Sequence, residues 1–256
     1  MDLDLKDRSV LITGGSKGIG LATALAFARE GARITIAGRD EERLAAARTA
    51  LSNHGASDIE SFIGDLSQSD DRQRLFAAHG VIDILVNNAG AIPGGNLLDL
   101  PLERWMESWQ LKVFGYIHLT QLYLSAMKER GEGVIINIIG SAGQAPRWDY
   151  ICGSSGNAAL MALTRAAGAK SVDWNVRILG INPAPTRTER VEVLARKKAQ
   201  DLYGDESRWA ETLSGLPFGR PSEPIEIADL AVMLASRRAS YLSGTIVDID
   251  GGQMYR

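Results

Sequence analysis

A glycine-rich turn near the amino terminus is the segment whose residue types point most directly to chemistry. The strand-like residues Arg8–Thr13 run into Gly14-Gly15-Ser16-Lys17-Gly18-Ile19-Gly20, and a helical pattern follows. Glycines here let the backbone turn tightly and approach a pyrophosphate, whose charge the amino terminus of the next helix stabilises. A turn that needs glycine only for its backbone angles is the alternative. The position of the turn after the first strand of an α/β series favours a dinucleotide site.

Two cations near this turn indicate which dinucleotide is bound. An NAD enzyme usually has an acidic residue at the end of the second strand, where it accepts hydrogen bonds from the ribose hydroxyls. Here Gly38 stands at that position with Arg39 beside it, and Lys17 adds a second cation. These residues suit a 2′-phosphate and predict NADP(H) over NAD(H), unless both cations are merely solvated. Asp40 is a rival ribose ligand, but it precedes two glutamates and is typical of a helix N-cap.

The elements that must position these residues form an α/β series. The alternation predicts right-handed βαβ units, and therefore a Rossmann-like, doubly wound, seven-stranded parallel sheet in a single domain spanning 1–256. The predicted strands are Arg8–Thr13, Arg33–Ala37, Glu60–Ile63, Ile82–Val86, Val134–Ile139, Val176–Asn182 and Thr245–Ile249. The predicted helices are Ile19–Glu30, Glu41–Ser52, Gln68–His79, Leu102–Glu129 and Ser154–Ser171.

A charged helical insertion, at about 188–215, interrupts the alternation between the last two strands. Ligands of doubly wound sheets bind outside the carboxyl ends of the strands, so this insertion is predicted to act as a lid. A surface hairpin that only packs is the alternative. Its cations Arg187, Arg190, Arg196, Lys197 and Lys198 would suit an anionic substrate, but interleaved acidic residues favour a solvated helix.

Composition excludes several function classes. The 28 Lys and Arg against 31 Asp and Glu give a net charge of −3, which argues against a protein that grips nucleic acid or an anionic membrane. No apolar run is long enough to cross a bilayer, and the charged amino terminus does not resemble a signal peptide. One cysteine and three histidines without ligand spacing predict no metal site. We therefore expect a cytoplasmic protein with a small-molecule substrate.

Nearly the whole chain resembles the short-chain dehydrogenase/reductase family. The matching segments include Thr13–Gly20, Asp65-Leu66, Asn87-Asn88-Ala89-Gly90, Trp105 with Gly115, Asn137-Ile138, Asn182–Thr188, Ser243-Gly244 and Asp250-Gly251-Gly252. The resemblance implies cofactor contacts by Gly14, Ser16, Gly18, Ile19, Asp65, Leu66, Asn88, Ala89, Gly90, Pro183, Ala184 and Thr188. The predicted cofactor site also includes Gly20 of the turn, the cations Lys17 and Arg39, and Lys112. Ala184 departs from the glycine usual in the family, so some crowding is expected there.

The same resemblance implies that the catalytic positions have changed. The family uses Ser, Tyr and Lys, with an Asn in the fifth helix, and its Tyr is the general acid/base. Alignment on Asn137-Ile138 and on Ala158-Ala159-Leu160 puts Gly140 at Ser, Gly153 at Tyr and Asn157 at Lys, and Lys112 falls at the Asn position. Glycine offers no proton donor, and loss of a general acid/base typically costs about 10²- to 10⁴-fold in rate.

Substitute groups lie close to these positions in sequence. Lys112 and Asn157 keep one ammonium and one amide with their places exchanged, and Lys112 is predicted to lie near the nicotinamide ribose and Asn157. Tyr150 is the nearest phenol, although reaching the nicotinamide would require its loop to fold inward. Ser141 is a further polar candidate. The alternatives are aromatic packing for Tyr150, an ordinary turn for Ser141 and a solvated cation for Lys112. Cys152 is more typical of a small buried hydrophobe than of a nucleophile.

Three functions remain open from the sequence. The first is an NADP(H)-dependent oxidoreductase with a rebuilt proton-transfer site, and the second is a catalytically silent NADP(H)-binding relative. The third is redox-neutral, lyase-type chemistry. Apolar residues on Leu102–Glu129, among them Phe114, Tyr116 and Leu119, together with the carboxyl-terminal tail, predict a homotetramer or at least a dimer.

Overall fold

The sheet of the computed structural model confirms the predicted fold class. Residues 2–56 and 58–255 are described, and within them seven parallel strands follow the order β3-β2-β1-β4-β5-β6-β7. The strands are β1 (Ser9–Thr13), β2 (Arg33–Gly38), β3 (Ile59–Ile63), β4 (Ile84–Asn87), β5 (Gly133–Ile138), β6 (Val176–Pro183) and β7 (Ile246–Ile249). The strand order reverses direction between β1 and β4, and in such sheets this switch point is where ligands bind.

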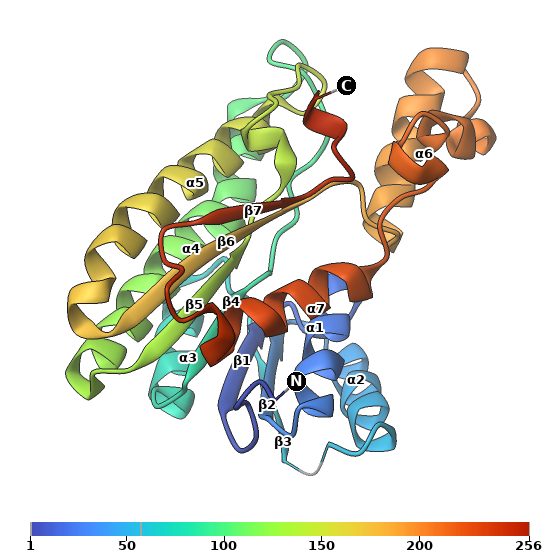
Figure 1. Ribbon diagram of the computed structural model, residues 1–256. Coiled ribbons are helices and arrows are strands. Elements are labelled where there is room, and N and C mark those ends of the chain that lie inside the picture. Colours follow the sequence, from blue (N-terminus) through green and yellow to red (C-terminus); the bar gives the residue numbers. More distant parts are fainter. Residues whose placement is uncertain (1, 57, 256) are drawn as a thin grey trace.

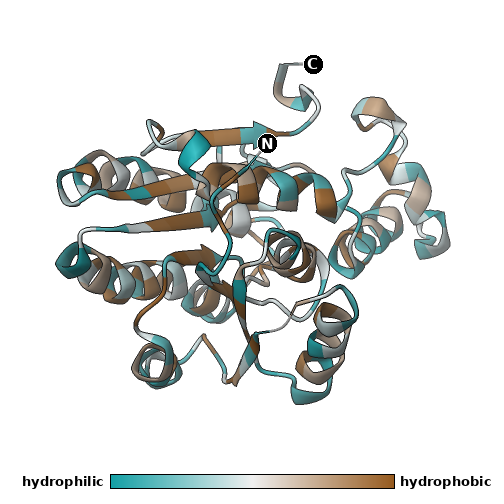
Figure 2. Cartoon of the chain, turned by 60° about the horizontal axis from the view of Figure 1, so that its bottom comes forward, coloured by the Kyte–Doolittle hydropathy of each residue, from teal (hydrophilic) through white to brown (hydrophobic). Residues whose placement is uncertain are grey.

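Helices cover both faces of the sheet, as parallel strands require (Figure 1). They are α1 (Gly18–Arg29), α2 (Glu41–Asn53), α3 (Ser69–His79), α4 (Leu102–Arg130), α5 (Ile151–Ser171) and α7 (Pro224–Ala235), whereas α6 (Glu189–Tyr203) lies outside these layers. One core cluster joins α1, α2 and α7 to the sheet, and a second joins α3 and α4 to its other face. Figure 2 shows the strands as a mostly apolar layer between these helices, whose outer faces are largely hydrophilic.

Two helices differ from the sequence prediction. Helix α5 begins at Ile151, three residues before the predicted start at Ser154, and Tyr150 is its N-cap residue. Gly153 and Gly156 lower the helix propensity of this turn, which explains why the predicted first residue of the helix lies too far along the chain. Helix α7 was not predicted. Pro224 in its first turn and a capping box between Glu223 and Glu226 define its start.

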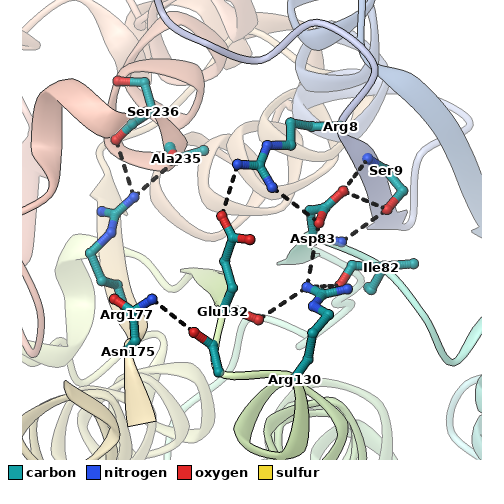
Figure 3. A network of polar contacts seen from close by, with 11 residues as sticks. Arg8, Ser9, Ile82, Asp83, Arg130, Glu132, Asn175, Arg177, Ala235 and Ser236 are labelled. Carbon is teal, nitrogen blue, oxygen red and sulfur yellow. Dashed lines mark hydrogen bonds and ion pairs between the residues drawn. The ribbon is translucent and has the colours of Figure 1, made fainter. Parts of the chain in front are cut away.

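Ion pairs fasten the end of the sheet opposite the glycine-rich turn (Figure 3). Arg8 donates to Asp83 and to Glu132, over 3.3 and 2.8 Å, which joins the starts of β1, β4 and β5. Arg177 in β6 donates to main-chain carbonyls at the carboxyl end of α7, including those of Ala235 and Ser236. Charged residues therefore anchor one end of the sheet, and the other end is available for a ligand site.

Candidate active site

The glycine-rich turn has the geometry that a pyrophosphate needs. Gly14 and Gly18 have φ angles of +65° and +55°, in the left-handed region that favours glycine. A β-carbon on Gly20 would stand 2.2 Å from the carbonyl oxygen of Gly14, so only glycine permits this close approach. Helix α1 begins at Gly18, and its first N–H groups are available to an anion.

Thr13 and Asn88 tie this turn to the neighbouring strand at the switch point. The side-chain amide of Asn88 donates to the carbonyls of Thr13 and Gly14 over 2.9 and 3.2 Å. The hydroxyl of Thr13 accepts hydrogen bonds from the N–H groups of Asn88 and Ala89 over 2.9 and 3.0 Å. Thr13 stood in the predicted motif without a role, and the structure shows that it sets the spacing of the two strand ends.

One cleft of about 1380 Å³ collects most of the predicted site residues. Its lining includes Gly14, Ser16, Lys17, Gly18, Ile19, Arg39, Asp65, Leu66, Asn88, Ala89, Gly90, Lys112, Ser141, Tyr150, Asn157, Pro183, Ala184 and Thr188. Gly20 and Gly153 do not line it; they lie behind it and make room for other groups. Ligand sites typically measure about 300–1,000 Å³, so this cleft is large enough for a dinucleotide and a second molecule.

Three cations surround the expected adenosine end of the cleft, but they are not equally available. The ammonium of Lys17 lies 2.5 Å from a carboxylate oxygen of Glu189 at the start of α6. Arg43, which the sequence analysis did not single out, contacts Asp40 over 3.1 Å and Glu189 over 3.4 Å. Arg39 is exposed and has no ion-pair partner within the described residues. Asp40 accepts a hydrogen bond from the N–H of Arg43, which confirms its role as the N-cap of α2.

Lys112 lies on the floor of the cleft at the carboxyl end of β5. Its ammonium donates to the carbonyls of Ile139 and Ile138 over 2.7 and 3.3 Å, and Gly90 packs against its aliphatic stem. The residue as a whole is half-buried, but its ammonium lies deep. Burial, together with the nearby Arg190 guanidinium, lowers the pKa of Lys112 to about 7. Near neutral pH this side chain can therefore both donate and accept a proton.

Asn157 contacts the same end of β5 from helix α5. Its side-chain amide donates to the carbonyl of Gly140 over 3.3 Å, and a β-carbon on Gly140 would stand 2.9 Å from that nitrogen. Within the described residues, Lys112 and Asn157 donate to successive carbonyls and do not hydrogen-bond to each other. The side-chain oxygen of Asn157 is buried without a protein partner, so it can accept a hydrogen bond from a ligand hydroxyl.

The ring of Tyr150 packs against Gly153 in the first turn of helix α5. A β-carbon on Gly153 would stand 2.0 Å from Cε1 and 2.1 Å from Cζ of Tyr150. Tyr150 also lines the cleft, and its main chain forms a β-bridge with Gly95. The ring therefore lies against the start of helix α5 and beside the cleft.

Two smaller candidates differ in their access to the cleft. Ser141 begins a short 3-10 helix (Ser141–Gly143), is half-buried and lines the cleft. Cys152 is fully buried, and its burial raises the pKa of the thiol. The cysteine is therefore a packing residue, as its sequence context indicated.

Comparison with known proteins decides the family. The family model described as short chain dehydrogenase matches residues 8–199. The chain belongs to the short chain dehydrogenase family. Among its relatives, the uncharacterized oxidoreductase YvrD of Bacillus subtilis is 31% identical and aligns over 98% of both chains. The 3-oxoacyl-acyl-carrier-protein reductase FabG of Chlamydia muridarum is 30% identical over 97% of this chain and 98% of its own.

A solved relative has the same architecture throughout. L-sorbose reductase from Gluconobacter frateurii, complexed with NADPH and L-sorbose, is 29% identical and superimposes with a TM-score of 0.91 over 100% of both chains. This short chain dehydrogenase is thus an oxidoreductase of carbonyl or alcohol substrates with a nucleotide-binding Rossmann fold.

The helical insertion of this dehydrogenase contains α6 and a 3-10 helix (Glu206–Leu213) and packs beside the cleft. Figure 1 shows α6 projecting beyond the carboxyl end of β6. Arg190 in its first turn donates to the carbonyl of Ile92, which follows β4. A β-carbon on Gly94 would stand 3.4 Å from Cδ2 of Leu194, so the two residues lie in contact. The insertion therefore contacts the loop across the cleft through both a polar and an apolar residue.

Within 2–56 and 58–255, no three His, Cys, Asp or Glu side chains gather closely enough to hold a metal ion. No helix in the same ranges has the length and apolar character to span a bilayer.

Proposed function

We propose that this protein is an NADP(H)-dependent carbonyl reductase or alcohol dehydrogenase whose proton donor is Lys112. The usual Ser, Tyr and Lys positions of the family are replaced here by Gly140, Gly153 and Asn157. The observation that carries the proposal is the ammonium of Lys112, held by two main-chain carbonyls on the cleft floor with its pKa lowered to about 7.

The residues of the cleft fit a nicotinamide dinucleotide. Gly14, Gly18 and Gly20 leave the close approach that a pyrophosphate requires. The unpartnered side-chain oxygen of Asn157 can accept a hydrogen bond from a nicotinamide ribose hydroxyl. When bound, the cofactor supplies or takes up the hydride at the carbonyl carbon.

Lys112 completes the reaction by moving the proton. As hydride reaches the carbonyl carbon, the π electrons pass to the carbonyl oxygen, and the ammonium of Lys112 gives that oxygen a proton. The neutral amine then regains a proton from water in the cleft. General acids work best with a pKa near the operating pH, and a value of about 7 meets that condition. Before transfer, the positive charge also stabilises the developing alkoxide.

Tyr150 and Ser141 have the supporting role of orienting the carbonyl with their hydroxyl groups. A tyrosine at position 153 would extend its whole ring beyond its β-carbon. The Tyr150 ring instead occupies that β-carbon position, so its phenol oxygen lies nearer the helix backbone than the family's phenol would. This difference favours Lys112 over Tyr150 as the proton donor.

NADP(H) is the preferred cofactor in this proposal. Arg39 is exposed beside the end of β2 without an ion-pair partner in the described part of the chain, so its two terminal donors are free for a 2′-phosphate. The NADPH complex of the related L-sorbose reductase is consistent with this choice.

Single-turnover absorbance at the NADPH band, with a panel of aldehydes and ketones, tests the donor assignment. We expect Lys112→Met to slow NADPH oxidation by about 10²- to 10⁴-fold and Tyr150→Phe to slow it much less. A large loss in Tyr150→Phe with Lys112→Met near the parent rate would assign the donor to Tyr150.

The absence of side-chain donors at Gly140 and Gly153 favours a second candidate, a catalytically silent NADP(H)-binding protein. NADPH binding without oxidation across the whole panel would support that candidate and reject the reductase.

A further inference from the structure

We infer that the substrate is an oxo acid, with its carbonyl at Lys112 and its carboxylate, or an equivalent anionic group, on the guanidinium of Arg190. The inference rests on the proposed function for the carbonyl but on separate residues for the anion. It follows from how the positive charges of the helical insertion are distributed.

The insertion carries several cations, and the structure separates them by their partners. Arg187 pairs with Glu223 over 2.7 Å, Arg196 with Glu192 over 2.7 Å, and Lys197 with Asp201 over 3.3 Å. These ion pairs explain why the sequence, with its interleaved acidic and basic residues, favoured a solvated helix. Lys198 lines the cleft near Asp149 without forming an ion pair, and Arg190 and Lys112 likewise have no carboxylate within ion-pair distance among residues 2–56 and 58–255.

The acidic groups that line the cleft form no ion pair with Lys112 or Arg190 within the described residues. Glu189 is shared by Lys17 and Arg43, and Asp149 forms an ion pair with Arg147 over 2.6 Å. Lys112 and Arg190 are therefore two neighbouring cations of the cleft whose charges no protein carboxylate neutralises. Their mutual repulsion is unfavourable without a ligand, and an anion between them would relieve it.

Arg190 is held in a way that leaves it able to bind a carboxylate. Its Nη2 donates to the main-chain carbonyl of Ile92, a buried residue on the opposite side of the cleft. This hydrogen bond fixes the guanidinium, which reaches across the cleft from α6. The side chain of Arg190 makes no other hydrogen bond within the described chain, so Nε and Nη1 keep their donors for a ligand. A guanidinium binds carboxylates through two parallel donors, and a fixed one loses less freedom on binding.

The position of Arg190 relative to Lys112 sets the chemical class. The stem of Lys112 packs against Gly90, and Arg190 donates to the carbonyl of Ile92, two residues further along the same loop, so both cations border one part of the cleft. A carbonyl at Lys112 and an anion at Arg190 therefore belong to one small molecule in which a few bonds separate them. Short 2-oxo and 3-oxo acids meet this condition, whereas neutral ketones leave Arg190 unpaired.

Two measurements test the inference. In the first, kcat/KM is compared for short 2-oxo and 3-oxo acids and for their methyl esters. We expect the acids to be favoured by roughly 10- to 150-fold, the equivalent of one charge-assisted hydrogen bond of ~1.5–3 kcal/mol. Arg190→Gln should bring the ratio of kcat/KM for acid and ester close to one, because any change in the pKa of Lys112 acts on both substrates alike, and Arg190→Lys should retain part of the preference. Arg196→Gln, on the same helix but paired with Glu192, is the matched control.

The second measurement needs no turnover. Malonate and succinate, and their neutral diamides, are titrated into the NADP⁺-loaded protein by calorimetry. Dicarboxylates that bind at least tenfold more tightly than diamides, with the difference lost in Arg190→Gln, support the anion site even if no carbonyl is reduced. Equal binding of acids and diamides, or a preference unchanged in Arg190→Gln, overturns the inference and leaves the reductase proposal standing.

Discussion

The ring of Tyr150 occupies the space in which a side chain on Gly153 would begin. A β-carbon on Gly153 would stand 2.0 Å from Cε1 of Tyr150, and real β-carbons do not approach other atoms so closely. The two residues therefore depend on each other: the glycine at 153 is what allows the aromatic ring of residue 150 to pack on helix α5. A tyrosine at 153 and the ring of Tyr150 could not occupy these positions together.

This relationship predicts a strong coupling between the two positions. Gly153→Ala must displace the Tyr150 ring, and we expect it to lower the free energy of unfolding by about 1–3 kcal/mol, as overpacking does. In a Tyr150→Ala background the same change should be neutral or stabilising by up to ~1 kcal/mol, because alanine has the higher helix propensity. Urea unfolding of the four proteins gives the coupling directly. Equal effects of Gly153→Ala in both backgrounds would contradict the packing described here.

The cofactor prediction concerns Arg39 and its two neighbouring cations. Arg39→Ala should weaken NADPH binding by roughly 10- to 150-fold, corresponding to one charge-assisted hydrogen bond of ~1.5–3 kcal/mol, and leave NADH binding unchanged. Lys17→Ala should have the smaller effect, because Glu189 already binds that ammonium over 2.5 Å. Calorimetric titration of both dinucleotides measures these differences. NADH binding as tight as NADPH in the parent protein would reject the preference.

Local sequence patterns predicted the fold and the nucleotide end of the site. The glycine spacing and the strand–helix alternation are short-range features, so Gly14, Gly18 and Asp40 were assigned correctly to a turn and an N-cap. Helix α7 was missed because its start follows a proline-rich turn, although the capping box at Glu223 and Glu226 was a usable signal.

Side-chain pairs between distant segments were beyond the reach of those patterns. Lys17 and Glu189 meet although they lie 172 residues apart, and Arg190 reaches the carbonyl of Ile92 from 98 residues away. A charged helix with alternating signs looks solvated in sequence, and only the packed fold separates Arg190 from its paired neighbours. The direction of the Tyr150 ring likewise depends on packing and not on its position in the chain.

The apolar surface of α4 that is available for a homotetramer or dimer is smaller than the sequence suggested. Tyr116 and Leu119 are buried inside the subunit, whereas Leu102, Met106 and Phe114 on α4 remain exposed. We expect light scattering at micromolar concentration to report a dimer or tetramer, and Phe114→Glu to reduce its size. Val81→Glu, at an exposed apolar residue outside α4, is the control. A monomeric parent protein would reject the assembly.

The lowered pKa of Lys112 predicts how stability depends on pH. In the native protein the pKa is about 7, against 10.5 for an ordinary lysine, so between these values the unfolded chain binds a proton that the native state lacks. The free energy of unfolding therefore gains a term that rises with pH from about 7 to about 10.5, by at most ~1.4 kcal/mol per pH unit. Below pH 7 both states hold the proton and the term is constant.

Lys112→Met isolates that term, because methionine keeps an unbranched apolar side chain and cannot titrate. The variant loses the hydrogen bonds to Ile138 and Ile139, which shifts its stability by an amount independent of pH. The variant also lacks the titration term. The difference between its free energy of unfolding and that of the parent should therefore be most favourable to the variant below pH 7 and should shift toward the parent as pH rises. Urea unfolding of the cofactor-free proteins between pH 6 and 9.5, at one fixed protein concentration, measures this difference. Parallel stability curves for the two proteins across that range would mean that the ammonium of Lys112 has an ordinary pKa, and a lysine of that kind would be a poor proton donor at neutral pH.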